Sequence, residues 1–318
     1  MNALQPPVIT VTFNPAIDET IALDALLPGT VHRARAVRFD PGGKGVIVAG
    51  CLADWGQRVV ATGLLGEDND APFTDLFAAK GIEDRFCRFS GPTRVNVKLV
   101  DPRDTTDINL PGADLAPEQM HRARDAVLAL ASSGAIVVLA GSLPADFPDD
   151  TYAHCIAELT ARQVRVVLDT SGPPLTAALQ AAAGALPHAI KPNRTELEAW
   201  AQRALPTHAD LISASRDLLT RGVALVAVSL GSEGAIFVTR EAALHASLPA
   251  MRPASTVGAG DAMVAGMVAG INSGAPIENI ARLATAFAYT KLGQIGANLG
   301  DPEHVRSQAA HVVIERLN

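Results

Sequence analysis

From about residue 136 onward, short aliphatic runs alternate with longer segments of helical periodicity. Ile136–Leu139, Val164–Leu168 and Leu225–Val228 have the near-continuous apolar character of buried strands. Helical patterns, such as those of Asp149–Ala161 and Asp210–Arg221, lie between them. Apolar strands separated by helices are typical of a parallel sheet that is covered on both faces. The sequence therefore predicts a doubly wound α/β fold, whose ligands bind beyond the carboxyl ends of the strands.

The first third of the chain has a different pattern. Thr20–Leu23, Val31–Phe39 and Val95–Leu99 show polar alternation, with little helix between them and with Pro-Gly and Gly-Pro turns nearby. Such segments are typical of strands with one solvated face. We expect a small antiparallel sheet, a lid, inserted within about residues 14–40 and 86–112.

Composition limits the partners of the chain. A net charge of −7 argues against nucleic acid and membrane surfaces, because both attract basic proteins. The most apolar stretches, Ala135–Ala140 and Ala262–Ile271, are too short to span a bilayer. Since no repeat or linker interrupts the sequence, we expect one domain over residues 1–318.

The cysteines indicate a compartment. Cys51, Cys87 and Cys155 lie far apart and match neither a metal-binding spacing nor a disulfide framework. We therefore expect a reducing cytoplasm.

A glycine-rich segment, Ser255–Asp261, runs directly into the apolar helical stretch Ala262–Gly266. Small residues at such a junction leave backbone N–H groups free at the positive end of the helix dipole, which favours an anion. Asp261 is then a candidate catalytic carboxylate. Taken alone, it is more typical of an ordinary helix cap than of a catalytic base.

Two further segments follow predicted strands. In Lys191–Glu196, Asn193 and Glu196 are three residues apart at a helix start, a spacing that suits either a capping arrangement or a Mg²⁺–phosphate anchor. Ser229–Gly234 is a glycine-rich turn, which suits either a plain hairpin or the close approach of a nucleotide.

Near the N-terminus, Pro41–Gly45 precedes a helical run. It is not a phosphate-binding loop of the Walker type, because the glycine spacing differs and no Ser or Thr follows Lys44. It does allow a polar ligand to lie against the backbone. Asp18, after the predicted strand Val8–Phe13, adds a carboxylate, although a solvated turn is the simpler interpretation.

Taken together, these segments resemble the ribokinase-like carbohydrate kinases, in particular their phosphosugar branch. The resemblance covers nearly the whole chain in order, through Asn14–Asp18, Gly42–Gly45, Thr93–Lys98, Gly141–Pro144, Lys191–Glu198, Ser229–Gly231 and Ser255–Gly266. It implies an ATP-dependent kinase with Mg²⁺ as cofactor, and a lid that pairs with a second subunit in a homodimer.

The resemblance also implies roles on the nucleotide side. Asp261 would be the catalytic base, and the N–H groups of Gly258, Ala259 and Gly260 would form the anion hole for the transferred phosphoryl group. The residues implied for ATP are Asn193, Ser229, Gly231 and Gly234, with Glu196 and Asn193 organising Mg²⁺.

On the sugar side, the resemblance implies that Asp18, Gly42 and Gly43 hold hydroxyl groups. A phosphate already on the sugar would be held by Arg94, whose guanidinium can make two parallel hydrogen bonds. The further cations implied for this phosphate are Lys44 and Arg33.

One position departs from the family pattern. Ile47 stands where a sugar-binding Asn is usual, and an aliphatic side chain facing a polar substrate group would alter specificity. The expected substrate is fructose 1-phosphate, phosphorylated at its 6-hydroxyl to fructose 1,6-bisphosphate. Tagatose 6-phosphate and fructose 6-phosphate are alternative substrates, and a non-catalytic sugar-phosphate sensor is an alternative of another class.

Overall fold

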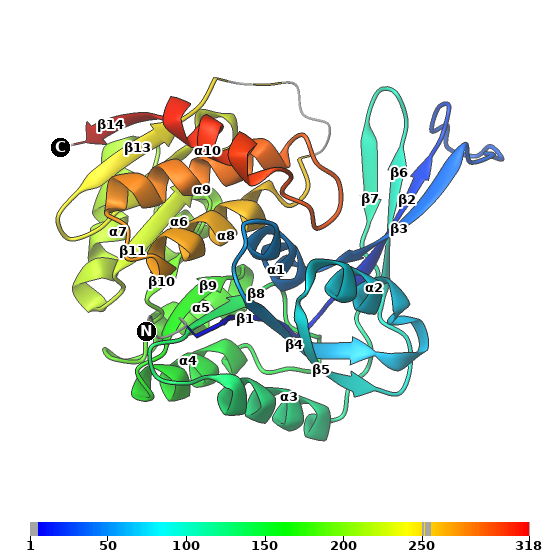
Figure 1. The fold of residues 1–318 in the computed structure, drawn as a ribbon, viewed down its shortest axis with the longest axis horizontal. Helices are drawn as coiled ribbons and strands as arrows, with labels where there is room; N and C mark the ends of the chain where they lie inside the picture. The colour runs from blue at the N-terminus through cyan, green and yellow to red at the C-terminus, as the bar shows by residue number, and fades with distance from the viewer. Residues whose placement is uncertain (1–5, 250, 252–255, 318) are drawn as a thin grey trace.

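The computed structural model describes residues 6–249, 251 and 256–317. Within these ranges, ten strands form one sheet that lies between two layers of helices (Figure 1). Their order across the sheet is β14 (Val313–Leu317), β13 (Ala243–Ser247), β12 (Ala235–Val238), β11 (Leu225–Ser229), β10 (Ala189–Ile190), β9 (Arg165–Asp169), β8 (Ile136–Ala140), β1 (Val8–Thr12), β4 (Val59–Gly66) and β5 (Glu83–Phe89). Pairing is parallel from β5 to β11 and antiparallel from β11 to β14. The predicted mainly parallel, doubly wound sheet is confirmed.

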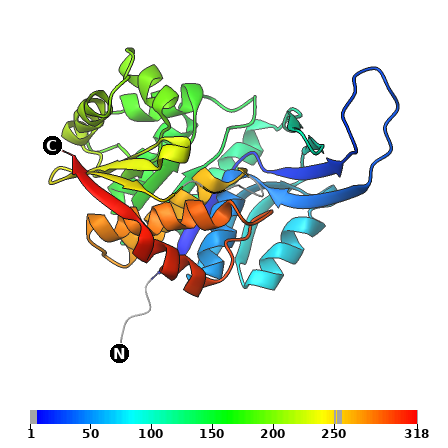
Figure 2. The same cartoon turned by 90° about the horizontal axis from the view of Figure 1, so that it is seen from above.

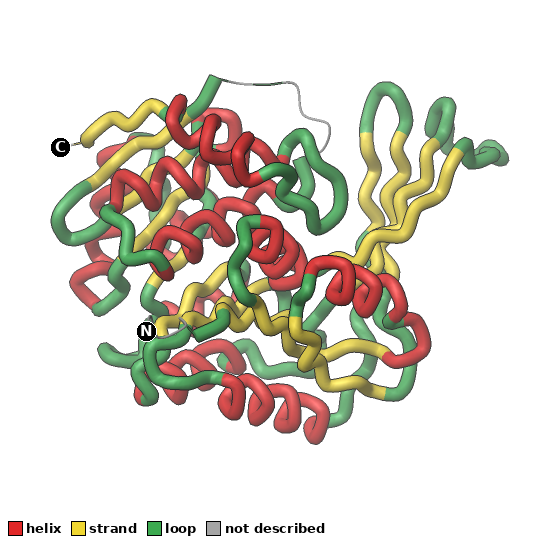
Figure 3. The backbone as a smooth tube through the Cα atoms, viewed as in Figure 1, coloured by secondary structure: helices red, strands yellow, loops and turns green. Residues whose placement is uncertain are grey.

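Two hydrophobic cores lie on opposite faces of this sheet, because successive strand residues point to opposite sides. In β1, Val8 packs into one core and Ile9 into the other. The first core is covered by α1 (Lys44–Asp54), α2 (Ala71–Lys80), α8 (Ala259–Asn272), α9 (Ile277–Lys291) and α10 (Pro302–His311). The second is covered by α3 (Pro117–Leu130), α4 (Thr151–Ala161), α5 (Gly172–Gln180), α6 (Arg194–Ala201) and α7 (His208–Arg221). The layered arrangement is visible in the tube drawing (Figure 3).

Glycines allow two helices of the first layer to approach their neighbours closely. A Cβ on Gly45 would lie 2.3 Å from Oγ1 of Thr12, so α1 packs directly on the end of β1. A Cβ on Gly266 would lie 2.7 Å from Cα of Ala284, where α8 crosses α9. The first contact places the start of α1 at the carboxyl end of β1, and the second holds α8 against α9.

A second sheet, the lid, projects from one side of the body (Figures 1 and 2). Its strand order is β3 (Ala36–Gly42), β2 (Ala16–Ala22), β6 (Val95–Val100) and β7 (Thr105–Ile108). The expected antiparallel arrangement is wrong for the central pair, since β2 and β6 are parallel. Both strands continue from parallel strands of the main sheet, β1 and β5, and therefore leave the body in the same direction.

Two boundaries of the lid also differ from the prediction. The expected strand Val31–Phe39 begins only at Ala36, because its partner β2 ends at Ala22, which pairs with Ala36. Residues 86–89 belong to the main sheet, because β5 pairs with β4 through Phe89.

No helix in the described part of the chain combines the length and hydropathy needed to cross a membrane.

Candidate active site

The helix α8 begins at the carboxyl edge of the main sheet with an open N-terminal turn. Its N-cap, Gly258, has φ 80°, a left-handed conformation that favours glycine. Within the described residues, no side chain caps this helix start. The N–H groups of its first turn are therefore available to an anion, as the sequence predicted. Ser255, the first residue of the predicted segment, lies outside the described residues.

Asp261 is the third residue of α8, and its side chain is buried. Burial, together with the negative charge of Asp169, raises the pKa of Asp261 to about 7, against an opposing effect of nearby lysines. A carboxyl group that titrates near neutrality can exchange a proton at physiological pH, as a general base must.

Charged side chains from four other places surround Asp261. Lys44 begins α1, Asp169 ends β9, Lys191 follows β10 and Lys291 ends α9. The Nζ atoms of Lys44 and Lys191 lie 3.3 and 3.4 Å from Oδ1 of Asp169. Although burial alone would lower the pKa of Lys44, the acidic groups around it, Asp169 first, outweigh burial and raise that pKa. We refer to these five side chains as the ion cluster.

Sequence reasoning assigned only Lys44 and Asp261 within the ion cluster. Asp169 and Lys191 each follow a predicted or observed strand of the parallel sheet, and that position could have marked them as ligand-edge residues. Lys291 carried no such signal, because a lysine at the end of an amphipathic helix is normally solvated.

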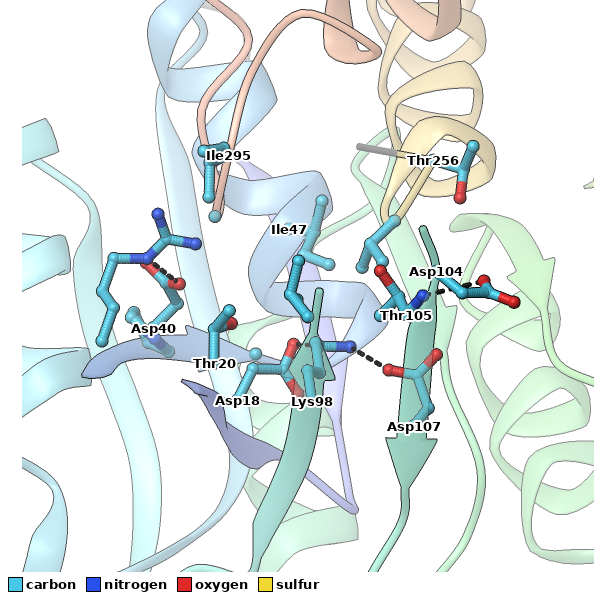
Figure 4. Close-up of a pocket in the computed structure, with 16 residues that line it drawn as sticks. Asp18, Thr20, Asp40, Ile47, Lys98, Asp104, Thr105, Asp107, Thr256 and Ile295 are labelled. Carbon is cyan, nitrogen blue, oxygen red and sulfur yellow. Dashed lines mark hydrogen bonds and ion pairs between the residues drawn. The ribbon is translucent and has the colours of Figure 1, made fainter. Parts of the chain in front are cut away.

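A cavity of about 470 Å³ opens between the lid and the body (Figure 4). Asp18 and Gly42 line it, as expected of sugar-binding residues. Lys98 lies between two carboxylates, 3.6 Å from Asp18 and 3.5 Å from Asp107. Lys98 and Arg38, which also lines the cavity, are cations that the sequence analysis did not assign.

Ile47 projects from α1 into this cavity (Figure 4). Its Cγ2 lies 3.2 Å from the position that a Cβ on Gly258 would take, so it packs against the start of α8. The departure from the family pattern therefore places an aliphatic surface between this cavity and the first turn of α8.

A second cavity, of about 410 Å³, lies on the other side of the start of α8. Ser229, Gly231 and Gly234 line it, as predicted for nucleotide-binding residues. The turn that holds them joins the antiparallel strands β11 and β12, so it is a hairpin and a cavity wall at once. The remaining wall is largely apolar and is formed by Leu248, Pro249, Met251, Met263, Ala288, Tyr289 and Leu292. Apolar walls with a few polar groups are typical of sites for a flat organic ring.

The two cavities meet at the turn before α8. Thr256 lines both of them, Val257 lines the first, and Ala259 and Gly260 line the second. A group bound in one cavity can therefore reach a group bound in the other beside Asp261.

Asn193 and Glu196 form a reciprocal capping box at the start of α6. Oδ1 of Asn193 accepts from the N–H of Glu196, and Oε2 of Glu196 accepts from the N–H of Asn193, both at 2.8 Å. The backbone of Asn193 also forms a β-bridge with Ser229, which lines the second cavity, and the charge of Glu196 acts on Lys44. The capping interpretation is thus correct, and the box lies near both the second cavity and the ion cluster.

These residues are compatible with Mg²⁺. No group of three or more His, Cys, Asp or Glu side chains in the described residues forms a metal cage. Mg²⁺ commonly takes one or two carboxylates and completes its shell with substrate phosphates and water. The carboxylate of Glu196 beside an amide oxygen fits that donor set.

The cavity walls do not include Asp261, Gly258, Lys44, Asn193 or Glu196, and three other predicted residues also lie outside the walls of both cavities. Arg94 donates to the backbone carbonyls of Asn14, Pro15 and Leu110, and burial lowers its pKa. Gly43 is the N-cap of α1. Arg33 is exposed in the loop between β2 and β3.

Residues 11–304 match the model of the pfkB family of carbohydrate kinases. The chain belongs to this family. It is 51% identical over 309 residues to a 1-phosphofructokinase of Xanthomonas campestris pv. campestris, with 96% of this chain and 97% of that protein covered. It is 43% identical to a 1-phosphofructokinase of Rhodobacter capsulatus, with 98% of each covered. The phosphofructokinase-2 of Escherichia coli, solved in complex with fructose-6-phosphate, superposes with a TM-score of 0.87 at 26% identity, over 96% of this chain and 98% of that one.

These similarities confirm the predicted family, its ribokinase-like fold and an ATP-dependent kinase activity on a sugar phosphate. The roles of individual side chains stay predictions.

We expect Asp261→Asn to lower kcat at saturating substrates by about 10²-fold or more, because general-base catalysis typically contributes ~10²–10⁴. In the unaltered protein, kcat/KM should fall as the pH drops below about 7, where Asp261 takes up its proton. Steady-state rates between pH 5.5 and 9 measure both effects. A decrease in the kcat of Asp261→Asn of less than about tenfold would contradict the role of Asp261 as the base.

The same variant should be more stable than the parent protein at pH 8. The unfolded chain releases this proton near pH 3.8 and the folded chain near 7, so ionisation of Asp261 opposes folding as the pH rises through that interval. The Asp261→Asn variant has no ionisable group at this position, so its folding free energy does not carry this cost at pH 8. A higher Tm together with lost activity would show that the loss is not due to unfolding.

Proposed function

We propose that this protein transfers the γ-phosphoryl group of ATP to the 6-hydroxyl of fructose 1-phosphate, giving fructose 1,6-bisphosphate. The observation that carries the proposal is the meeting of two cavities at Thr256, beside a buried carboxylate and an open helix start. The relatives named 1-phosphofructokinase, which match the chain from end to end, support the choice of sugar phosphate.

In the proposed reaction, Asp261 accepts the proton of the attacking hydroxyl. The N–H groups of the Gly258–Gly260 turn and the ammonium groups of Lys44 and Lys191 stabilise negative charge on the moving phosphoryl group. Phosphoryl transfer depends mainly on such positioning and charge stabilisation. When bound, Mg²⁺ would neutralise charge on the ATP phosphates, held by Glu196 and Asn193.

On the acceptor side, we propose that Asp18 and the backbone at Gly42 and Gly43 hold sugar hydroxyls. Arg94 would bind the substrate phosphate. Its guanidinium has five N–H donors, and three of them are used by backbone carbonyls, so two can serve a ligand. Lys44, the other main cation expected at this phosphate, is held by Asp169, and the proposal uses it at the moving phosphoryl group instead. Arg33 lies in the outer loop of the lid, and the proposal does not depend on it.

We further propose that the lid pairs with the lid of a second copy. Residues alternate between its faces: Arg38 and Asp40 line the cavity, whereas Val37 and Phe39 point away from it. Val37 and Phe39 are 48% and 55% exposed, and Ile108 on β7 adds to the same outer face. An apolar sheet face of this kind is typical of a surface that another protein covers.

The predicted cytoplasmic location also remains a proposal. Cys51, Cys87 and Cys155 are free thiols, which suits a reducing compartment.

A panel of acceptors tests the reaction. We expect kcat/KM with ATP to be highest for fructose 1-phosphate, compared with fructose 6-phosphate, tagatose 6-phosphate and unphosphorylated fructose. ³¹P NMR of the product identifies the hydroxyl that is phosphorylated. A higher kcat/KM for another sugar phosphate would reassign the substrate, and binding without ATP consumption would indicate a sensor.

Arg94→Ala should raise the KM for the sugar phosphate by about 10–100-fold and leave the KM for ATP within about twofold. This follows because a charge-assisted hydrogen bond contributes ~1.5–3 kcal/mol. Arg85→Ala is a matched control, since Arg85 pairs with Glu83 on the exposed side of β5. Equal changes in both KM values would show that Arg94 only anchors the lid.

Phe39→Asp should convert a dimer into monomers by placing a charge in the apolar lid face. Light scattering after size-exclusion chromatography measures the mass. Val313→Asp places the same charge at an exposed apolar residue of β14 and should leave the mass unchanged. A parent protein that is monomeric at micromolar concentration, or a Phe39→Asp variant of unchanged mass, would refute lid pairing.

A further inference from the structure

Asp169 is a buried carboxylate that the proposed chemistry does not use. It ends β9, and its side chain is only 1% exposed. Its two oxygens have unequal surroundings. Oδ1 lies within 3.4 Å of both Lys44 and Lys191, whereas Oδ2 has no hydrogen-bond partner among the described residues. A buried acceptor without a partner costs about 1–3 kcal/mol of folding free energy. Such an atom is unusual in a residue whose role is only structural.

The two lysines held by Asp169 point to the site of transfer. A Cβ on Gly260 would lie 3.4 Å from Nζ of Lys191, so this ammonium sits against the first turn of α8. Lys44 comes from α1, the helix whose Ile47 packs against the start of α8. Both ammonium charges act on Asp261. One carboxylate oxygen thus joins two cations that come from different elements packed at the anion-binding turn.

Such a bridge limits how far the cations can move. A lysine side chain has many rotamers and gives up free energy when it is ordered. Oδ1 of Asp169 fixes both ammonium groups before any ligand arrives, so less ordering remains for the transition state. Groups that are already in place when charge develops contribute most to catalysis.

We propose that Asp169 is a positioning residue of the kinase: it holds Lys44 and Lys191 at the Gly258–Gly260 turn and sets a second negative charge beside Asp261. This inference rests on the proposed function. Asp169 lines neither cavity, and it would act through the lysines and through the base.

The second part of the proposal, a negative charge beside Asp261, follows from the ionisable groups that surround Asp261. The ionisable groups that face it are Lys44 and Cys51 from α1, Asp169 from β9, Lys191 after β10 and Lys291 from α9. Of the other groups in this set, only Asp169 is a carboxylate. Its charge disfavours ionisation of Asp261 and so makes the base stronger, whereas the three lysines do the opposite.

Asp169→Asn keeps the shape of the side chain and removes its charge. We expect kcat to fall by about 10–100-fold and the acid limb of the kcat/KM–pH profile to move to lower pH by about 0.5–1 unit. Asp54→Asn is the control, because Asp54 pairs with Lys80 in another largely buried ion pair away from the site. This control should lower Tm without moving the profile.

A double-mutant cycle tests the link to the lysine. If Asp169 acts through Lys191, the loss in kcat for Asp169→Asn combined with Lys191→Gln should be clearly smaller than the product of the two single losses. Multiplicative losses, or an Asp169→Asn variant with the kcat and pH profile of the parent protein, would overturn the proposal.

A readout without turnover separates this inference from the proposed reaction. Carboxyl-carbon NMR of protein labelled at aspartate follows the titration of Asp261 directly, with Asp261→Asn to assign its resonance. Asp169→Asn should lower the titration midpoint of Asp261, and Asp54→Asn should leave it unchanged. An unmoved midpoint refutes the field effect even if no tested sugar phosphate is a substrate, and an inactive parent protein with a moved midpoint refutes only the proposed reaction.

Discussion

The charge balance around Asp261 is the constraint on which the rest of the site depends. A carboxylate transferred alone into a protein interior costs several kcal/mol, and a second carboxylate beside it adds to that cost. The ammonium groups of Lys44, Lys191 and Lys291 and the positive end of α8 offset it. These groups come from three helices and the end of a strand, so the active site exists only when the two ends of the chain are packed together. One contact that joins these two parts is that of Ile47 of α1 with Gly258 at the start of α8, while the close contacts at Gly45 and Gly266 hold α1 on β1 and α8 on α9.

Patterns over a few neighbouring residues predicted the strands of the main sheet and the start of α8. The apolar runs at 136–139, 164–168 and 225–228 are long enough to show their period, and each is a strand of the main sheet. The Gly258–Asp261 segment predicted a helix start with free N–H groups, because glycines directly before an apolar helical stretch leave the backbone uncovered. The direction of β6 beside β2 could not be predicted, since alternation of side chains is the same in parallel and antiparallel strands. The ion cluster was mostly missed, because its members are distant in sequence and each is ordinary in its own surroundings.

Several residues serve structure and the site at the same time. Asn193 and Glu196 complete a capping box, and the same geometry holds them beside Ser229 and within the field of Lys44. The Gly231–Gly234 turn closes a hairpin and forms a cavity wall. At these positions the capping or hairpin interpretation and the ligand-binding interpretation are compatible, because the same geometry satisfies both. The physical reason is that the carboxyl edge of a parallel sheet is where helices begin and also where ligands bind.

The shared wall at Thr256 has a kinetic consequence. The cavity lined by Asp18 is proposed for the sugar phosphate, and the cavity lined by Ser229 is proposed for ATP. The two meet at the turn before α8, where they share Thr256 and no other lining residue. In the proposed reaction both cavities would be filled at once, so transfer would take place in a ternary complex. A phosphorylated form of the protein, whose kinetic sign is a ping-pong pattern, would not be needed between the two substrates.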